Sequence, residues 1–208
     1  MSPRRTLVVA ATLLLCAGLR PLEATDPSKP PAEQVDMVQM MERMKQFTAT
    51  GPEHVWLQRF LGEWQTETRI GMHGPQRPPD KGTSRGRWLI DGRWLVLESE
   101  GTMMGMPVKS CFVLGYDRFK MSFVTSFVSS VDTAMTHSEG DIDPKTGALL
   151  TYGTLDEYLT GEHDKMVKYV WRFPDENTMI LEIHDLPIGE TDAKVVEVTY
   201  RRKAGSAR

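Results

Sequence analysis

The chain has 208 residues, of which 40% are hydrophobic and 25% are charged, and its formal net charge at pH 7 is -3. This length is enough for one domain with a substantial core and too short for two domains of ordinary size. Because the net charge is small and both signs are interspersed, nothing indicates a nucleic-acid partner or an anionic membrane surface.

Residues 1–24 have the pattern of a bacterial secretory signal peptide. Two arginines precede an apolar run over residues 7–15, which is too short to span a bilayer, and small residues follow. We expect cleavage near Ala24, with Ala17 as the alternative, so that no integral membrane segment remains in the mature chain. The protein is therefore expected to be secreted or periplasmic, with Cys111 as the cysteine of the mature chain.

A proline-rich polar stretch, residues 25–32, is expected to be a linker. An amphipathic helix is expected over residues 33–49, because apolar side chains recur there on one stripe: Met37, Met40, Met41, Met44 and Phe47. Thioether sulfurs suit copper(I), but methionines at this spacing are typical of a helix that packs on a domain. The spacing therefore favours packing.

A second, short helix is expected from Thr50, which forms a possible capping box with Glu53. Trp56 and Phe60 share one face of this helix, and Gly62 ends it. From there the chain alternates between apolar and polar residues, which is the period of a β-strand.

Ten segments with strand character follow one another, separated by turn residues such as Asp91-Gly92: 63–72, 83–90, 93–101, 107–116, 121–130, 134–142, 148–158, 165–173, 178–186 and 193–203. No segment with helical period interrupts them, so the strands are expected to be antiparallel. Closure removes exposed edges. We therefore predict a mainly β domain over residues 50–203, a closed or nearly closed up-and-down barrel of about ten strands with N-terminal helices, and a tail at residues 204–208.

The tripeptide Gly62-Glu63-Trp64 lies between the short helix and the first strand. In this position it resembles the Gly-x-Trp signature of the calycins, which include the lipocalins and fatty-acid-binding proteins. The resemblance implies that Trp64 closes one barrel end, under an arginine of the last strand. Arg201 and Arg202 stand at that place, and the alternation along the strand favours Arg202.

A second resemblance covers residues 53–203. It depends on four motifs: Leu57-x-x-x-Leu61-Gly62-x-Trp64, Gly92-Arg93, Met106-Pro107 and Gly115-Tyr116-Asp117. These motifs are similar to those of a bacterial family known as domain of unknown function 1579. That family carries no established activity, so the resemblance implies a fold and leaves the function open.

Catalytic and metal-binding motifs are not evident. The histidines are scattered, and the sequence has no nucleophile elbow, P-loop or dinucleotide fingerprint. We expect no metal ion and no cofactor; a haem held by one histidine, as in some barrels that resemble calycins, is the alternative. Two His/Glu pairs have the spacing of one strand face, His137 with Glu139 and Glu182 with His184. We expect the second pair to face solvent, and His137 to be the best candidate for a polar group inside the barrel.

Aromatic residues are expected to line the barrel. A barrel of about ten strands is wider than the eight-stranded size that side chains just fill, so a cavity is expected. The predicted ligand-binding residues are Phe112, Tyr116, Phe123, Phe127, His137 and Trp94. We predict binding of a small apolar or amphipathic ligand rather than catalysis. A barrel enzyme with a buried His/Glu pair and an interaction module without a ligand are the alternatives, and the oligomeric state stays open.

Overall fold

The computed structural model describes residues 36–71, 78–157, 161–186 and 193–205. The chain divides into two units, Met1–Met40 and Met41–Arg208, and the second unit holds the barrel. The predicted signal peptide at residues 1–24 and the predicted linker at residues 25–32 lie outside the described residues.

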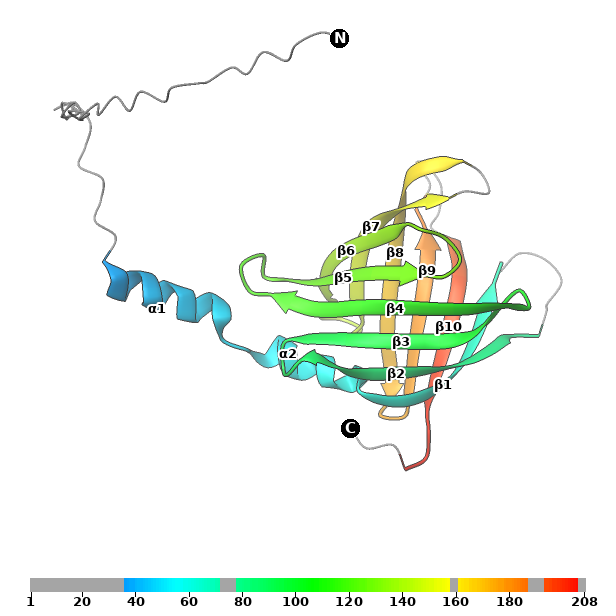
Figure 1. Cartoon of the computed structure of the whole chain (residues 1–208), viewed down its shortest axis with the longest axis horizontal. Helices are drawn as coiled ribbons and strands as arrows, with labels where there is room; N and C mark the ends of the chain where they lie inside the picture. Colours follow the sequence, from blue (N-terminus) through cyan, green and yellow to red (C-terminus); the bar gives the residue numbers. More distant parts are fainter. Residues whose placement is uncertain (1–35, 72–77, 158–160, 187–192, 206–208) are drawn as a thin grey trace, which may run out of the picture. The chain divides into compact units, whose positions relative to one another are not determined.

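The barrel unit contains ten strands, each paired antiparallel with its neighbours in sequence, and the first strand also pairs with the last (Figure 1). The sheet is therefore a closed up-and-down barrel, which confirms the predicted fold. The strands are β1 (Gly62–Ile70), β2 (Asp80–Ile90), β3 (Trp94–Met103), β4 (Met106–Asp117), β5 (Ser122–Ser129), β6 (Met135–Ile142), β7 (Leu149–Glu157), β8 (Glu162–Asp175), β9 (Thr178–Asp185) and β10 (Ala193–Arg202).

Alternation along the strands builds one interior core, because every second side chain of a strand points to the same face. The largest fully buried side chains of the strands come from both halves of the sheet: Trp64, Leu95, Leu97, Leu114, Leu149, Val167, Trp171, Met179 and Leu181. Burial of each such side chain contributes about 1.5–3 kcal/mol, so this core is the main source of stability.

Two short helices, α2 (Pro52–Trp56) and the 3-10 helix η1 (Leu57–Phe60), close one end of the barrel. Leu57 and Phe60 are fully buried, and the Phe60 ring packs edge-on against Trp171 with 5.1 Å between the ring centroids. The predicted capping box of Thr50 and Glu53 is wrong. The helix begins one residue later than expected, with Gly51 at the cap, and Nδ1 of His54 accepts the Gly51 N–H at 3.1 Å.

Trp64 completes this closed end. It is fully buried, and its Nε1 donates to the carbonyl of Phe60 at 3.0 Å. The guanidinium carbon of Arg202 lies 4.0 Å from the centroid of the Trp64 ring. Arg202 also donates to the carbonyls of Leu61 at 2.6 Å and Glu176 at 3.1 Å. Arg202 rather than Arg201 occupies this place, since Tyr200 and Arg202 share the inward side of β10.

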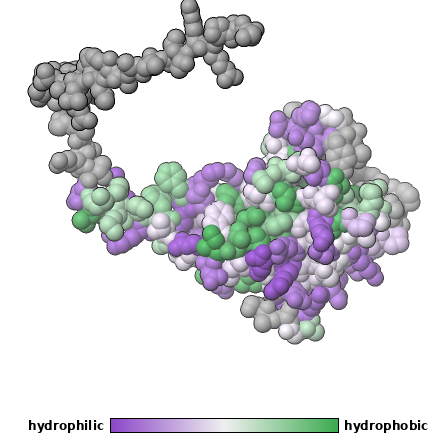
Figure 2. All heavy atoms as spheres, viewed as in Figure 1, coloured by the Kyte–Doolittle hydropathy of each residue, from purple (hydrophilic) through white to green (hydrophobic). Residues whose placement is uncertain are grey.

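Helix α1 (Met37–Thr48) precedes the barrel in the sequence and has no buried residue. Met41 and Met44 are 57% and 55% exposed, so the methionines do not show the packing that we predicted for this stripe. Phe47, at the end of the stripe, does pack, with 5.1 Å between its ring centroid and that of Phe119. Figure 2 shows hydrophobic residues on the surface of this helix. Within the described chain, no helix is both long enough and apolar enough to cross a membrane.

Candidate ligand-binding cavity

A cavity of about 270 Å³ lies inside the barrel, toward the end away from α2 and η1. It reaches from the middle of β1 to that strand's last residue, Ile70, and is walled by seven strands. Its apolar lining includes Phe112, Phe127, Leu181, Ile183, Val196 and Val198. A volume of this size corresponds to roughly nine water molecules, at about 30 Å³ each in the liquid.

Aromatic rings form the inner part of the lining. The Phe112 and Phe127 rings lie 4.4 Å apart, and Phe112 packs against Trp171 at 5.4 Å. Tyr200, on the opposite wall, is also 6.0 Å from Trp171. Trp171 thus lies directly behind two lining residues, although it does not itself line the cavity.

Small and hydroxyl-bearing residues make up another part of the wall. Gly82 and Gly101 face each other across β2 and β3 and both line the cavity. A Cβ on Gly82 would lie 2.5 Å from the carbonyl oxygen of Glu100 and 2.8 Å from Oγ1 of Thr66. The wall is therefore bare backbone at this point, and a side chain there would force the strands apart.

Tyr200 carries the most buried hydroxyl-bearing side chain of the lining. The residue is 3% exposed, and within the described part of the chain its hydroxyl has no hydrogen-bond partner. Burial raises the pKa of Tyr200, so the hydroxyl stays protonated and can donate. Thr66 stands directly opposite Tyr200 across β1 and β10, is 8% exposed, and also lines the cavity.

Other hydroxyls inside the barrel are satisfied by one another. Oγ1 of Thr125 and Oγ of Ser138 lie 2.7 Å apart, and Ser138 donates to Oγ1 of Thr151 at 2.8 Å. All three residues are buried, at 7%, 3% and 0% exposure. The sequence signal for this ladder is a small hydroxyl residue at nearby inward positions of β5, β6 and β7, which our sequence reasoning missed.

Charged groups are scarce around the cavity. Among the described lining residues Lys81 is the one cation, and its side chain is exposed. Lys165 alternates with the buried Val167 on β8 and so faces inward, but carboxylates of Glu157 and Asp185 each lie 2.9 Å from its Nζ. These two carboxylates hold the pKa of Lys165 well above its usual value. Lys165 therefore stays protonated, and the two carboxylates compensate its positive charge. It is not a lining residue.

Comparison with known protein families gives one match for this chain. The family described as "protein of unknown function (DUF1579)" matches residues 49–202, which span every strand of the barrel. The chain belongs to this family. A comparison with curated protein sequences gave no match.

Among solved structures, a redesigned β-barrel is similar to this DUF1579 member over 71% of the chain and 94% of its own, with 11% identity and a TM-score of 0.35. A similarity this low carries no argument about function.

Of the six predicted ligand-binding residues, Phe112 and Phe127 line the cavity. Phe123 and Tyr116 face inward but pack at the helical end, with 5.0 Å between their ring centroids. The Phe123 ring also contacts Trp56 of α2 at 5.4 Å. These two residues therefore belong to the core that closes the barrel.

The prediction that His137 points into the barrel is wrong. Its side chain is exposed, and its Nδ1 lies 2.9 Å from Oγ of Ser126 on the outer face of β5. Trp94 also faces outward, because a Cβ on Gly115, an outward position of β4, would lie 2.3 Å from the Trp94 ring. Neither residue lines the cavity.

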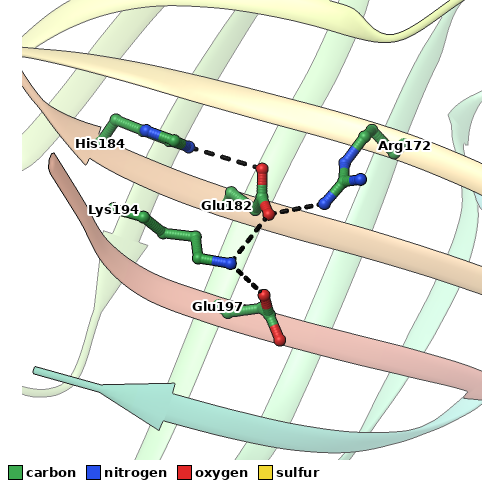
Figure 3. A network of polar contacts seen from close by, with 5 residues as sticks. All are labelled: Arg172, Glu182, His184, Lys194 and Glu197. Atoms are coloured by element: carbon green, nitrogen blue, oxygen red, sulfur yellow. Dashed lines mark hydrogen bonds and ion pairs between the residues drawn. The ribbon is translucent and has the colours of Figure 1, made fainter. Parts of the chain in front are cut away.

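The second His/Glu pair lies on the outward face of β9, but it does not face solvent as we expected: the side chains of Glu182 and His184 are 12% and 16% exposed. They belong to a network across β8, β9 and β10 (Figure 3). The Glu182 carboxylate accepts hydrogen bonds from Arg172 at 2.5 Å and from Lys194 at 3.1 Å, and His184 Nε2 lies 3.5 Å away. Burial alone would raise the pKa of Glu182, but Lys194 and Arg172 together hold it below its usual value. Such a carboxylate is a weak proton acceptor, so the pair does not favour the enzyme alternative.

Metal ligands and nucleophiles give no further candidate. Among residues 36–71, 78–157, 161–186 and 193–205, no group of three His, Cys, Asp or Glu side chains could hold a metal ion. Cys111 is half-buried beside Phe112, and its burial raises the pKa of the thiol. The thiol form is a poor nucleophile.

Proposed function

We propose that this protein binds a small apolar or amphipathic ligand inside its barrel. The observation that carries the proposal is the 270 Å³ cavity, whose wall combines Phe112, Phe127 and branched aliphatic side chains with a few hydroxyls. Ligand sites are typically concave and mostly apolar, with a small number of polar groups that fix orientation. The closed helical end makes this a pocket rather than a channel.

The expected site of action is outside the cytoplasm. The leader pattern of residues 1–24 supports export, and a barrel that carries a small apolar molecule through an aqueous compartment is consistent with that location. Ligand loading would then occur in the mature protein.

Thermal melting in the presence of candidate ligands tests the proposal. A ligand at a hundred times its dissociation constant adds about 2.7 kcal/mol to the free energy of unfolding. For a domain of this size this corresponds to a rise in melting temperature of about 5–11 °C. Tryptophan fluorescence should change in parallel, because Trp171 lies directly behind Phe112 and Tyr200.

A pair of variants on β10 separates cavity binding from surface binding. Val198→Phe places a ring into the cavity, whereas Thr199→Phe adds the same ring at the next, outward position. We expect the first variant to stay folded and lose both responses, and the second to keep them. Equal responses from the two variants, or no response from the wild-type protein across a broad panel of small apolar ligands, would refute the proposal.

A further inference from the structure

We infer that the ligand of this cavity is an uncharged amphiphile, whose oxygen accepts a hydrogen bond from the hydroxyl of Tyr200. Alcohols, ketones and esters belong to this class, and carboxylates and amines do not. The inference rests on the proposed function and adds the chemistry of the ligand's polar group.

Tyr200 has a buried hydroxyl without a partner in the described part of the chain. Its side chain is 97% buried, as its exposed fraction is 3%, and it lines the cavity. Nothing in the described chain accepts its O–H, whereas the buried hydroxyls of Thr125, Ser138 and Thr151 bond to one another. Buried polar groups in folded proteins are normally paired, so an acceptor inside the cavity is the natural partner of this hydroxyl.

Thr66 places a second hydroxyl-bearing side chain beside Tyr200. Thr66 lies directly across from it in the β1–β10 pairing, where opposite side chains approach closely. Its hydroxyl also has no side-chain partner among the described residues, although the residue is 8% exposed. Thr66 therefore adds a second hydroxyl to the same part of the cavity wall.

The charges around the cavity exclude an ionised group. An ion moved from water into an apolar site needs an opposite charge beside it. No described lining residue in the interior offers one: Lys81 is exposed, and the acidic residues Glu100 and Asp132 are exposed as well. Lys165, the inward-facing lysine, is already bound to Glu157 and Asp185. The charged residues of the lining are therefore exposed, and the buried part of the wall is uncharged, with Tyr200 as its most buried hydroxyl.

A matched ligand series tests the inference. A ketone, a primary alcohol, a carboxylate and an amine that share one six-carbon chain, together with the alkane, are titrated calorimetrically into the wild-type protein at neutral pH. We expect the ketone and the alcohol to bind at least tenfold more tightly than the carboxylate and the amine.

Two variants assign the effect to the buried hydroxyl. Tyr200→Phe should weaken ketone binding about fivefold, the usual contribution of one neutral hydrogen bond, and leave alkane binding unchanged. Tyr152→Phe is the matched control, since Tyr152 is 46% exposed on the barrel surface. The infrared carbonyl band of the bound ketone should shift to lower frequency in the wild type and in Tyr152→Phe, and return toward its apolar-solvent position in Tyr200→Phe.

The two proposals fail in different ways. If no member of the series binds, the proposed function fails and this inference fails with it. If ligands bind, but the carboxylate or the amine binds as tightly as the ketone, only the inference is overturned. An unchanged carbonyl band in Tyr200→Phe, with binding retained, likewise overturns the assignment to Tyr200.

Discussion

Replacement of Arg202 by methionine should destabilise the closed end of the barrel. The guanidinium stacks 4.0 Å from the Trp64 ring centroid and donates to the carbonyls of Leu61 and Glu176. A cation–π contact contributes about 0.5–2 kcal/mol, and a hydrogen bond from a charged group about 1.5–3 kcal/mol. Because Arg202 is half-buried, water can reach this site in the variant and can bond to the carbonyls that Arg202 leaves, so the expected loss is smaller than the sum of the separate contributions. We expect Arg202→Met to lower the free energy of unfolding by about 2–4 kcal/mol.

Arg201 provides the matched control, since it directly precedes Arg202 on β10 and its side chain is exposed. Arg201→Met should change the free energy of unfolding by no more than about 0.5 kcal/mol, as is usual at surface positions. Urea unfolding, followed by tryptophan fluorescence, measures both variants. Arg202→Met should also melt about 4–16 °C lower than the wild type. Equal losses in the two variants would refute the assignment of the closing role to Arg202.

Three further predictions concern charge, reactivity and processing. Because the pKa of Glu182 is lowered, its ionised carboxylate contributes to stability above about pH 4.5, the ordinary pKa, and this contribution is lost as the pH falls through the lowered pKa. Urea unfolding should therefore show a smaller difference in free energy of unfolding between wild type and Glu182→Gln at pH 3 than at pH 7. Alkylation of Cys111 at neutral pH should be slower in the folded protein than in urea, because burial raises the pKa of its thiol, and equal rates would contradict this. Mature protein recovered from its source should lack residues 1–24 by intact-mass measurement, and a retained leader would exclude cleavage.

The barrel could be predicted because local signals agreed along most of the chain. Turn residues such as Asp91-Gly92 separated the strands, and the position of Gly62-x-Trp64 after a short helix marked the closed end. Gly62 has a φ of 109°, which side chains rarely adopt, so glycine is required where η1 passes into β1. Alternation along β10 also distinguished Arg202 from Arg201.

Errors arose where alternation did not show which face is inside. On β3, Leu95, Val96 and Leu97 are all buried, so both faces of the strand are apolar and the side of Trp94 could not be predicted. On β6 the inward face holds small hydroxyl residues such as Ser138, which are satisfied by neighbouring strands rather than by apolar contact. The alternation along β6 therefore does not distinguish the outward His137 from its inward neighbours.

The position of the cavity follows from a gradient of side-chain size along the inward face of several strands. From the helical end outward, β1 presents Trp64, Thr66 and Thr68; β3 presents Leu95, Leu97, Ser99 and Gly101; and β4 presents Leu114, Phe112, Ser110 and Val108. Large rings fill the barrel beside η1, and small residues face one another at the other end, so the same cross-section holds less side-chain volume there. Once the inward parity of a strand is known, this gradient can be read from the sequence. That the Tyr200 hydroxyl has no partner among the described residues cannot be read from the sequence, because it depends on which side chains of other strands surround it in the folded barrel.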